Sequence, residues 1–207
     1  MLKRSFDILV SLTAIFILSP VMIVVCVLVN FNLGRPVVFS QLRPGLNGKG
    51  FRMYKFRTMT NAVNNAGETL PDAERLTHFG NNLRITSLDE FPGLWNVLKG
   101  DMSLVGPRPL LPAYYEYYTE REQLRHTVKP GVTGWAQVNG RNTLNWDDRL
   151  AMDVWYVENQ SFNLDLKILL LTIKKVTKRE GVVVDARSVM KNFDEERKSK
   201  RTSSNEN

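Results

Sequence analysis

The sequence carries an adjacent pair of carboxylates, Asp89 and Glu90, within the motif SLDEFPG. A carboxylate pair can act on phosphate groups when cationic side chains stand beside it to balance the charge. The chain offers five such residues in short motifs: Lys55 and Arg57 in KFRTM, Arg84 in LRITS, Arg108 in GPRP and Arg141 in NGRN. Because arginine binds phosphate in a planar, bidentate manner, these residues are candidate phosphate ligands.

Each of these basic residues, taken alone, is more commonly a solvated surface charge. Their collection in loops rich in glycine and proline favours function, since functional residues tend to lie on loops. The prolines on both sides of Arg108 are expected to hold its backbone rigidly. The loop of residues 129–141 contains three glycines and Trp135, which either stacks on a base or packs in the core. Its glycines match no standard dinucleotide or P-loop fingerprint.

The two carboxylates also have a purely structural interpretation. Ser87 and Glu90 have the spacing of a capping box, which predicts a helix from near Asp89 to Lys99, ended by Gly100. Pro92 argues against this interpretation, because it would then lie at the fifth helical position, where its missing N–H costs a hydrogen bond. Proline prefers the first helical position, and a helix that begins there would leave both carboxylates just ahead of it.

Composition narrows the classes of partner and metal. The chain has 207 residues, 43% of them hydrophobic, which suits one compact domain. The net charge of +7 and the pI of about 9.6 favour an anionic partner: nucleic acid, phospholipid or a phosphorylated substrate. Cys26 is the only cysteine, which excludes a disulfide framework, and the two histidines are too few for an ordinary histidine site. Any metal is therefore expected to be a hard cation held by carboxylates and phosphates.

Residues 8–29 form an almost continuous apolar run that indicates a membrane segment. As a straight helix it would reach about 33 Å, enough for a single span. Two features favour a re-entrant helix-break-helix instead. Ser19 and Pro20 lie in the middle of the run, where proline should bend the helix and the serine hydroxyl can rebond a freed carbonyl. Basic residues, which favour the cytoplasmic side, flank the run at both ends. A cleaved signal peptide is disfavoured by the length of the run and the lack of a cleavage site.

The remainder of the chain predicts a mainly helical α+β fold around a small β-hairpin. Residues 36–41 and 51–57 read as strands joined by a turn-rich connection, and residues 60–72 as a polar loop. The tyrosine-rich stretch 110–118 suits either the lipid–water interface or the core. Residues 163–179 form a basic amphipathic helix, with Asn163 as its expected cap, that packs on the core or lies at a membrane surface. We predict a membrane hairpin over 1–34, a catalytic domain over 35–185 and a charged tail over 186–207, disordered at its end.

The motifs KFRTM, SLDE, FPGLWNVLKGDMSLVGPRPLL and PGVTGWAQVNGRN occur in an order that resembles the bacterial sugar transferase family, the monotopic polyprenol-phosphate phosphoglycosyl transferases. The resemblance covers residues 1–180 and is closest to the minimal catalytic form. It departs from the family at Ile85, where a basic residue is usual, and at Phe91 and Gly93, where Leu-Pro-Gln is common. Neither departure alters the chemistry that the resemblance implies.

The resemblance implies a reaction and a location. Asp89 would attack the β-phosphate of a UDP-sugar and release UMP, and polyprenol (undecaprenyl) phosphate would then accept the phosphosugar. Glu90 would assist by positioning or as a base, and Mg²⁺ would be shared by Asp89 and the diphosphate. Lys55, Arg108 and Arg141 would hold phosphate or uridine diphosphate groups. A re-entrant helix broken at Ser-Pro would place the catalytic domain on the cytoplasmic face of the bacterial inner membrane.

Other functions fit the sequence less completely. A non-catalytic protein bound to membrane lipids would explain the charge and the apolar run but gives no role to the carboxylate pair. A nucleic-acid partner is not expected, because the chain has a membrane segment and no recognisable nucleic-acid module. A homo-oligomer is possible, although no oligomerisation motif is evident.

Overall fold

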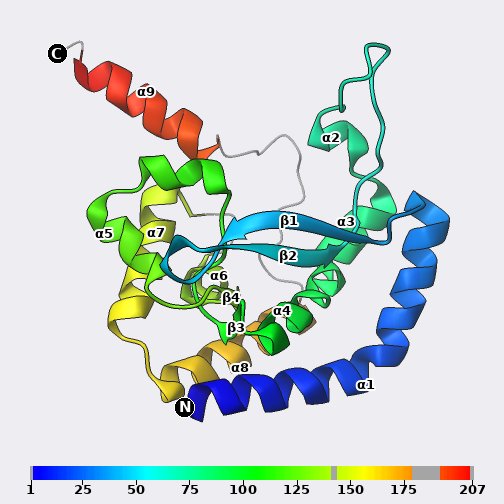
Figure 1. Ribbon diagram of the computed structural model, residues 1–207, viewed down its shortest axis with the longest axis horizontal. Helices are drawn as coiled ribbons and strands as arrows, with labels where there is room; N and C mark the ends of the chain where they lie inside the picture. The colour runs from blue at the N-terminus through cyan, green and yellow to red at the C-terminus, as the bar shows by residue number, and fades with distance from the viewer. Residues whose placement is uncertain (1, 141–143, 179–191, 206–207) are drawn as a thin grey trace.

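The computed structural model describes residues 2–140, 144–178 and 192–205, and the chain is mainly helical (Figure 1). The α-helices are α1 Leu2–Leu33, α2 Asp72–Arg75, α3 His78–Ile85, α4 Gly93–Lys99, α5 Glu120–Gln123, α6 Trp135–Asn139, α7 Trp146–Glu158, α8 Phe162–Lys178 and α9 Phe193–Asn205. The strands are β1 Val38–Pro44, β2 Gly50–Phe56, β3 Ser103–Val105 and β4 Gly131–Thr133. Short 3-10 helices are η1 Leu46–Gly48, η2 Leu88–Glu90, η3 Pro112–Tyr117 and η4 Leu124–His126.

Helix α1 is the apolar N-terminal segment, and it bends part-way along its length (Figure 1). Pro20, inside the helix, has no N–H to offer the carbonyl of Phe16 four residues earlier. The Ser19 hydroxyl donates to that carbonyl instead, at 2.8 Å, which confirms the expected rebonding. By length and composition α1 is able to cross a membrane.

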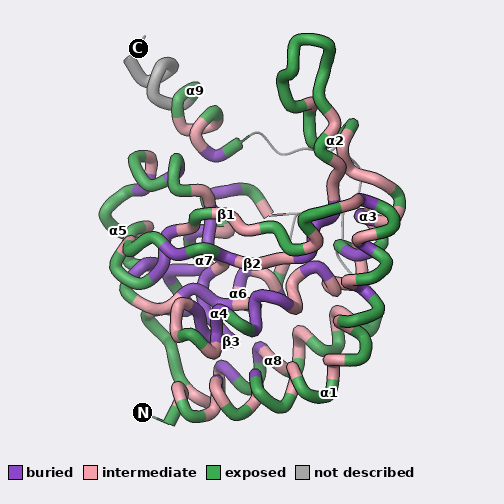
Figure 2. The backbone as a smooth tube through the Cα atoms, turned by 45° about the vertical axis from the view of Figure 1, so that its right-hand side comes forward, coloured by how far each residue is buried: buried purple, intermediate pink, exposed green. Residues whose placement is uncertain are grey.

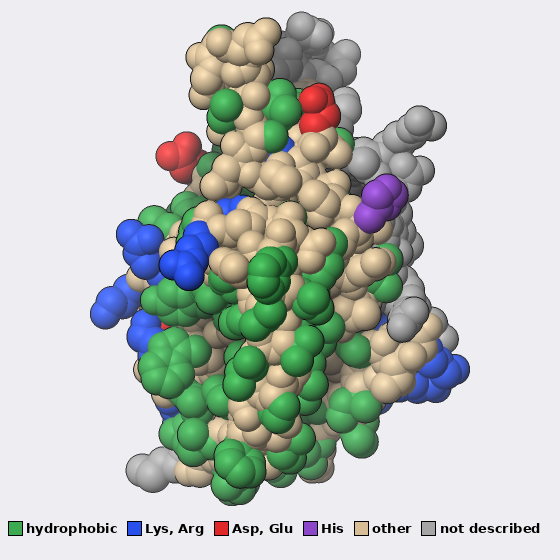
Figure 3. Space-filling model, turned by 90° about the vertical axis from the view of Figure 1, so that its right-hand side faces the viewer, with side chains coloured by type: hydrophobic (Ala, Val, Ile, Leu, Met, Phe, Trp, Pro, Cys, Tyr) green, Lys and Arg blue, Asp and Glu red, His purple; other side chains and the backbone are tan. Residues whose placement is uncertain are grey.

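The outer surface of α1 is apolar. Its exposed large side chains include Leu9, Leu12, Phe16, Ile17, Val21, Ile23, Val24, Val27, Leu28 and Phe31. In Figure 3, hydrophobic side chains cover much of the lower part of the face on which the second half of this helix lies. Such an extended apolar surface is unusual on a soluble monomer and fits membrane association.

The expected hairpin is present, with β1 antiparallel to β2 and a register that pairs Val38 with Phe56 and Pro44 with Gly50. Strand β1 runs three residues further than the prediction. A buried side chain of α4 attaches the hairpin to the body of the protein: Asn96 Oδ1 accepts from Tyr54 N at 3.0 Å, and its Nδ2 donates to Arg52 O at 2.7 Å.

A second, parallel pair of strands, β3 and β4, was not predicted. Strand β4 and helix α6 occupy the stretch of residues 129–141 that the sequence suggested was a loop. Glycines permit the close approach of these segments. A Cβ at Gly131 would lie 2.1 Å from the nitrogen of Gly106, and one at Gly134 would lie 2.2 Å from its oxygen. These glycines of the PGVTG motif are thus explained by backbone packing against the GPRP motif.

Three hydrophobic clusters hold these elements together. The central one gathers α4, α7, α8 and the first half of α1 around residues such as Val97, Met102 and Ile168. Figure 2 shows buried backbone concentrated around α4, α6, α7 and β3, whereas α1 and the loop beside α2 are mostly exposed or half-buried. The second half of α1 packs with β2 and α3 around Val29 and Phe56.

The third cluster settles one sequence-based alternative and corrects one expectation. Tyr114 and Tyr118 of the tyrosine-rich stretch are buried and pack with Trp146 and Phe193, so the core interpretation holds for them. Phe193 begins α9, so the tail expected to be disordered at its end is helical to Asn205.

Two further expectations concern α6 and α8. Trp135 packs against the central cluster and stacks on Trp155, with ring centroids 4.8 Å apart. Helix α8 was expected to be capped by Asn163, and this was wrong. Ser161 Oγ accepts from the backbone nitrogen of Leu164 at 3.2 Å, and Asn163 lies inside the helix. The helix packs one face on the core and exposes Leu166, Leu170 and Ile173.

Candidate active site

A cavity of about 1190 Å³ lies between the hairpin, η2, α6, α8 and α1. It brings together six of the seven residues that the sequence marked for chemistry: Lys55, Arg57, Arg84, Asp89, Glu90 and Arg108. Arg141, the seventh, lies outside the described residues. Residues separated by more than fifty positions therefore line one cavity.

The backbone around Asp89 excludes the capping-box interpretation. Ser87 adopts a left-handed conformation, with φ of 57°, and its side chain makes no capping hydrogen bond. Asp89 and Glu90 lie in the short η2, and Pro92 is the N-cap residue of α4. Helix α4 begins one residue after the proline, close to the alternative prediction, and ends at Gly100 as expected. The carboxylates therefore precede the helix and are available to the cavity.

Glu90 is fixed by two cations. Lys55 Nζ lies 2.7 Å from Glu90 Oε1, and an Arg108 side-chain nitrogen lies 2.9 Å from the same oxygen. Burial alone would raise the pKa of the Glu90 carboxyl, but the charges of Arg108 and Lys55 outweigh it and lower that pKa to about 2. Glu90 is therefore a persistent anion and a weak base.

Asp89 is less closely paired with cations than Glu90. It is 6% exposed, and its ion pair with Lys55 is longer, at 3.5 Å. Burial raises the pKa of Asp89 above its usual value, against the opposing influence of Lys55. Among the described residues no closer hydrogen-bond donor engages Asp89, so its oxygens remain able to meet a ligand in the cavity.

Arg84 and Arg57 have distinct anchors. Arg84 Nε donates to Thr58 Oγ1 at 3.1 Å, which directs its guanidinium along the cavity wall. Helix α3 comes very close to this segment, since a Cβ at Gly80 would lie 1.7 Å from Thr58 O. Arg57 is buried and donates to Arg35 O at 2.8 Å, which ties the end of β2 to the turn after α1.

The sequence did not reveal the support behind Arg108. Arg125 donates to the carbonyl of Arg108 at 2.7 Å and forms a buried ion pair with Asp153, at 2.8 Å. The side chains of Arg125 and Asp153 are 1% and 3% exposed. Nothing in the local pattern around either residue marks them, because they meet only through the packing of η4 on α7.

Further arginines line the cavity. Arg43 of β1 and Arg149 of α7 face it together with Arg108. Burial and the charge of Arg108 lower the pKa of Arg43 to about 10. This concentration of positive charge favours an anionic ligand.

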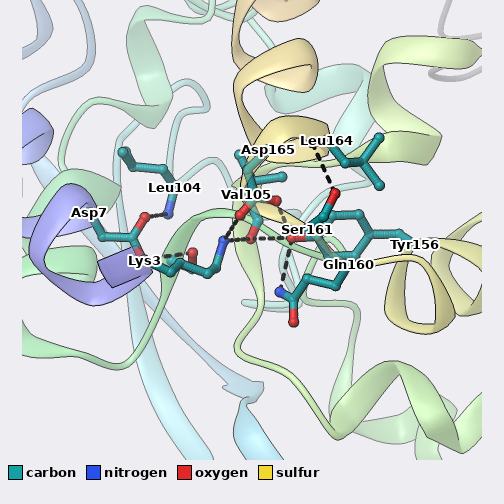
Figure 4. A network of polar contacts seen from close by, with 10 residues as sticks. Lys3, Asp7, Leu104, Val105, Tyr156, Gln160, Ser161, Leu164 and Asp165 are labelled. Carbon is teal, nitrogen blue, oxygen red and sulfur yellow. Dashed lines mark hydrogen bonds and ion pairs between the residues drawn. The ribbon is translucent and has the colours of Figure 1, made fainter. Parts of the chain in front are cut away.

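The first turn of α1 is tied to the strand that leads to Arg108 (Figure 4). Lys3 pairs with Asp165 of α8 and donates to Val105 O at 3.2 Å. Tyr156 lies beside both, with its hydroxyl 2.6 Å from Asp165 Oδ1. Asp7 is buried and accepts from Leu104 N at 3.3 Å and from the neighbouring serine hydroxyl. These contacts join the apolar helix α1 to the strand that precedes the GPRP segment.

Within the described ranges, no group of three or more His, Cys, Asp or Glu side chains is gathered that would bind a metal by itself. A metal at this site would have to take most of its ligands from elsewhere. A substrate diphosphate and water are the usual sources for magnesium.

Comparisons with known proteins agree with the geometry. The profile of the family described as "Bacterial sugar transferase" matches residues 1–179. The uncharacterized sugar transferase EpsL of Bacillus subtilis is 52% identical over 181 residues, which cover 87% of this chain and 90% of that relative. The undecaprenyl-phosphate galactose phosphotransferase of Salmonella typhimurium is 42% identical over 87% of this chain. The UDP-glucose:undecaprenyl-phosphate glucose-1-phosphate transferase of Escherichia coli is 40% identical over 84% of it.

The matched region spans only 41% and 40% of the latter two relatives, but nearly all of EpsL. It contains the hairpin, η2, the GPRP segment and α8, and thus every described residue of the candidate site. With its paired carboxylates, its arginine-lined cavity and a profile match over most of its length, this chain belongs to the bacterial sugar transferase family.

Proposed function

We propose that this protein transfers a sugar 1-phosphate from a UDP-sugar to polyprenol (undecaprenyl) phosphate and releases UMP. The observation that carries the proposal is Asp89, a buried carboxylate with open coordination beside Lys55, Glu90 and Arg108. The names of the Salmonella and Escherichia relatives supply the acceptor lipid and the type of donor. The sugar is a glucose- or galactose-type residue in those relatives, and the assay below identifies the one used here.

The reaction proceeds in two displacements at phosphorus. An Asp89 oxygen attacks the β-phosphorus of the UDP-sugar. The bond from that phosphorus to the bridging oxygen breaks, and UMP leaves with the electron pair. An oxygen of the lipid phosphate then attacks the same phosphorus and expels the Asp89 carboxylate, giving a polyprenol diphosphate sugar. The desolvated Asp89 suits the role of nucleophile, since carboxylates form acyl phosphates in other phosphoryl transfers.

Glu90 holds neighbouring cations in place and does not act as a base. A carboxyl group with a pKa of about 2 has little tendency to take a proton at neutral pH. Its two ion pairs hold Lys55 and Arg108 at the place where negative charge builds up on the phosphate and the leaving group. Arg84 and Arg43 extend this positive surface along the cavity.

Mg²⁺ fits this site as an ion coordinated by both the protein and the substrate. Asp89 has oxygens to spare, whereas those of Glu90 are engaged by cations, so Asp89 is the residue that would bind the ion. Magnesium commonly takes one or two carboxylates and completes its shell with substrate phosphates and water. When bound, it neutralises the diphosphate and stabilises the departing UMP.

Helix α1 would enter and leave the membrane by the cytoplasmic face. Its bend, the hydroxyl of Ser19 on the Phe16 carbonyl, and the basic residues at both ends support a re-entrant arrangement. The start of α1 is tied to the rest of the chain through Lys3 and Asp7, which favours an arrangement with both ends of α1 on one side. With this arrangement we expect the site to lie at the level of the lipid phosphates of the inner membrane.

The test is UMP release by the purified chain with Mg²⁺ and a panel of UDP-sugars, with and without undecaprenyl phosphate. Lipid-dependent UMP release is expected with one sugar, together with a burst of about one equivalent without lipid. Asp89→Asn should abolish both, whereas Glu116→Gln, at an exposed carboxylate that does not line the cavity, should leave both intact. Release of UDP, or turnover by Asp89→Asn, would refute the mechanism. Membrane binding without nucleotide release would favour the non-catalytic alternative.

A further inference from the structure

The lining of the cavity also includes residues from two helices that carry no arginine into it, α1 and α8. Helix α1 contributes Ala14 and Leu18, and α8 contributes Thr172, Lys175 and Val176. Ala14 and Leu18 are four positions apart, and Lys175 and Val176 follow Thr172 by three and four positions, so on each helix the residues share one side. The wall between α1 and α8 is thus largely apolar, apart from one lysine and one hydroxyl.

This wall adjoins an apolar outer surface. Next to the lining residues, α1 exposes Phe16 and Ile17, and α8 exposes Leu170 and Ile173. The two helices lie side by side at their beginnings, where the rings of Phe6 and Phe162 are 5.1 Å apart. A hydrocarbon chain lying against the outer surface would therefore meet apolar side chains along its way to the cavity.

Lys175 is the cation on this wall. It is half-buried and lines the cavity, whereas its neighbour Lys174 is exposed and does not. Among the described residues no carboxylate pairs with Lys175. A partly buried lysine side chain without a carboxylate partner, beside apolar side chains, matches the head of an amphiphile whose phosphate follows a hydrocarbon tail.

We propose that polyprenol phosphate enters the cavity between α1 and α8, with its isoprenoid tail against Leu18 and Val176 and its phosphate on Lys175. The proposal rests on the proposed function, which supplies the lipid acceptor. It assigns separate places to the two substrates: the nucleotide diphosphate binds at Arg108, Arg84 and Lys55, and the lipid phosphate arrives along the lining that α1 and α8 contribute. Asp89 lines the same cavity and is thus open to both.

The experiment compares Lys175→Ala with the matched control Lys174→Ala, both in the full chain purified in a non-ionic detergent without phospholipid. Loss of one charge-assisted phosphate contact at a half-exposed site should raise the KM for undecaprenyl phosphate about tenfold. The KM for the UDP-sugar and the burst of UMP without lipid should stay unchanged. Lys174→Ala should match the wild type, and Lys175→Arg should restore most of the affinity.

A direct readout separates this inference from the proposed function. Binding of undecaprenyl phosphate, followed by native mass spectrometry without UDP-sugar, should weaken by the same factor in Lys175→Ala. If the wild type releases no UMP but binding still depends on Lys175, the lipid site stands and the proposed reaction fails.

Three results would overturn the inference. Equal effects of Lys175→Ala and Lys174→Ala would indicate general surface charge. A raised KM for the UDP-sugar would place Lys175 in the nucleotide site. An effect that appears only with anionic phospholipid vesicles, and not in detergent, would assign Lys175 to membrane headgroups. Thermal unfolding of each variant shows whether the fold is retained.

Discussion

Variants of the buried ion pair behind Arg108 are expected to change the stability of the fold and the rate of catalysis separately. Asp153→Asn keeps the shape of the side chain but removes the charge that balances Arg125, whose side chain is 1% exposed. An unpaired buried charge costs about 3–5 kcal/mol. For a chain of this size that corresponds to a fall in Tm of about 6–20 °C.

A double variant, Arg125→Met with Asp153→Leu, removes both charges together. Replacing a buried ion pair by apolar residues of similar volume is often neutral, so stability should return to within about 2 kcal/mol of the wild type. Activity should not return, because the Arg108 carbonyl has lost its 2.7 Å hydrogen bond from Arg125. Misplacing a phosphate ligand by about 1 Å can cost a hundredfold, so kcat/KM should fall about tenfold to a hundredfold.

Thermal unfolding in detergent and lipid-dependent UMP release measure the two effects on the same samples. Stability that survives Asp153→Asn would show that the pair adds nothing to the fold. A double variant as active as the wild type would show that the prolines around Arg108 hold it without help from Arg125. Either result would refute the reasoning.

Three other perturbations have definite expected outcomes. Glu90→Gln removes a negative charge that raises the pKa of Asp89, so the acid limb of the pH profile for the UMP burst should move to lower pH. Gly80→Ala, normally stabilising in a helix by about 1 kcal/mol, should instead lower the Tm, because its Cβ would meet Thr58 O at 1.7 Å. A Leu2→Cys side chain, in a chain whose native cysteine is replaced, should react with an impermeant maleimide only from the cytoplasmic side if α1 is re-entrant.

Each of these has a control or a contrary result. An acid limb that moves to higher pH in Glu90→Gln would contradict the charge argument. Gly93→Ala is the control for Gly80→Ala, since a Cβ there meets nothing closer than 3.8 Å and should not lower the Tm. Labelling of Leu2→Cys from the periplasmic side in intact cells would favour a single span. Labelling from that side after Pro20→Ala alone would show that the proline keeps the helix from crossing.

Local sequence patterns predicted the elements that local forces determine. The hairpin followed from strand-forming runs joined by LRPGLNGKG, and the end of α4 followed from Gly100, which has φ of 90°. The position of Pro92 correctly placed the carboxylates ahead of the helix. The cavity residues were recognisable because their chemistry is concentrated in a few short motifs.

Contacts between distant segments could not be predicted from the sequence. Strands β3 and β4 have three residues each, too few to show a period, and they pair only because glycines let the backbones meet. The partnership of Arg125 with Asp153 depends on the packing of η4 on α7. The capping-box pattern at Ser87 was misleading because its left-handed backbone leaves the side chain unable to cap.

The ties between the first turn of α1 and the rest of the chain also constrain the order of biosynthesis. Lys3 meets its partners 102 and 162 residues later in the sequence, at Val105 and Asp165. Helix α1 leaves the ribosome before these partners, so Lys3 stays unpaired until α8 has been translated. Because contacts of such long sequence separation form slowly, the nascent helix has to lie at the membrane in an unfinished state. A ribosome stalled before codon 165 should therefore yield a chain that is membrane-bound but readily digested by protease, which becomes resistant once α8 emerges.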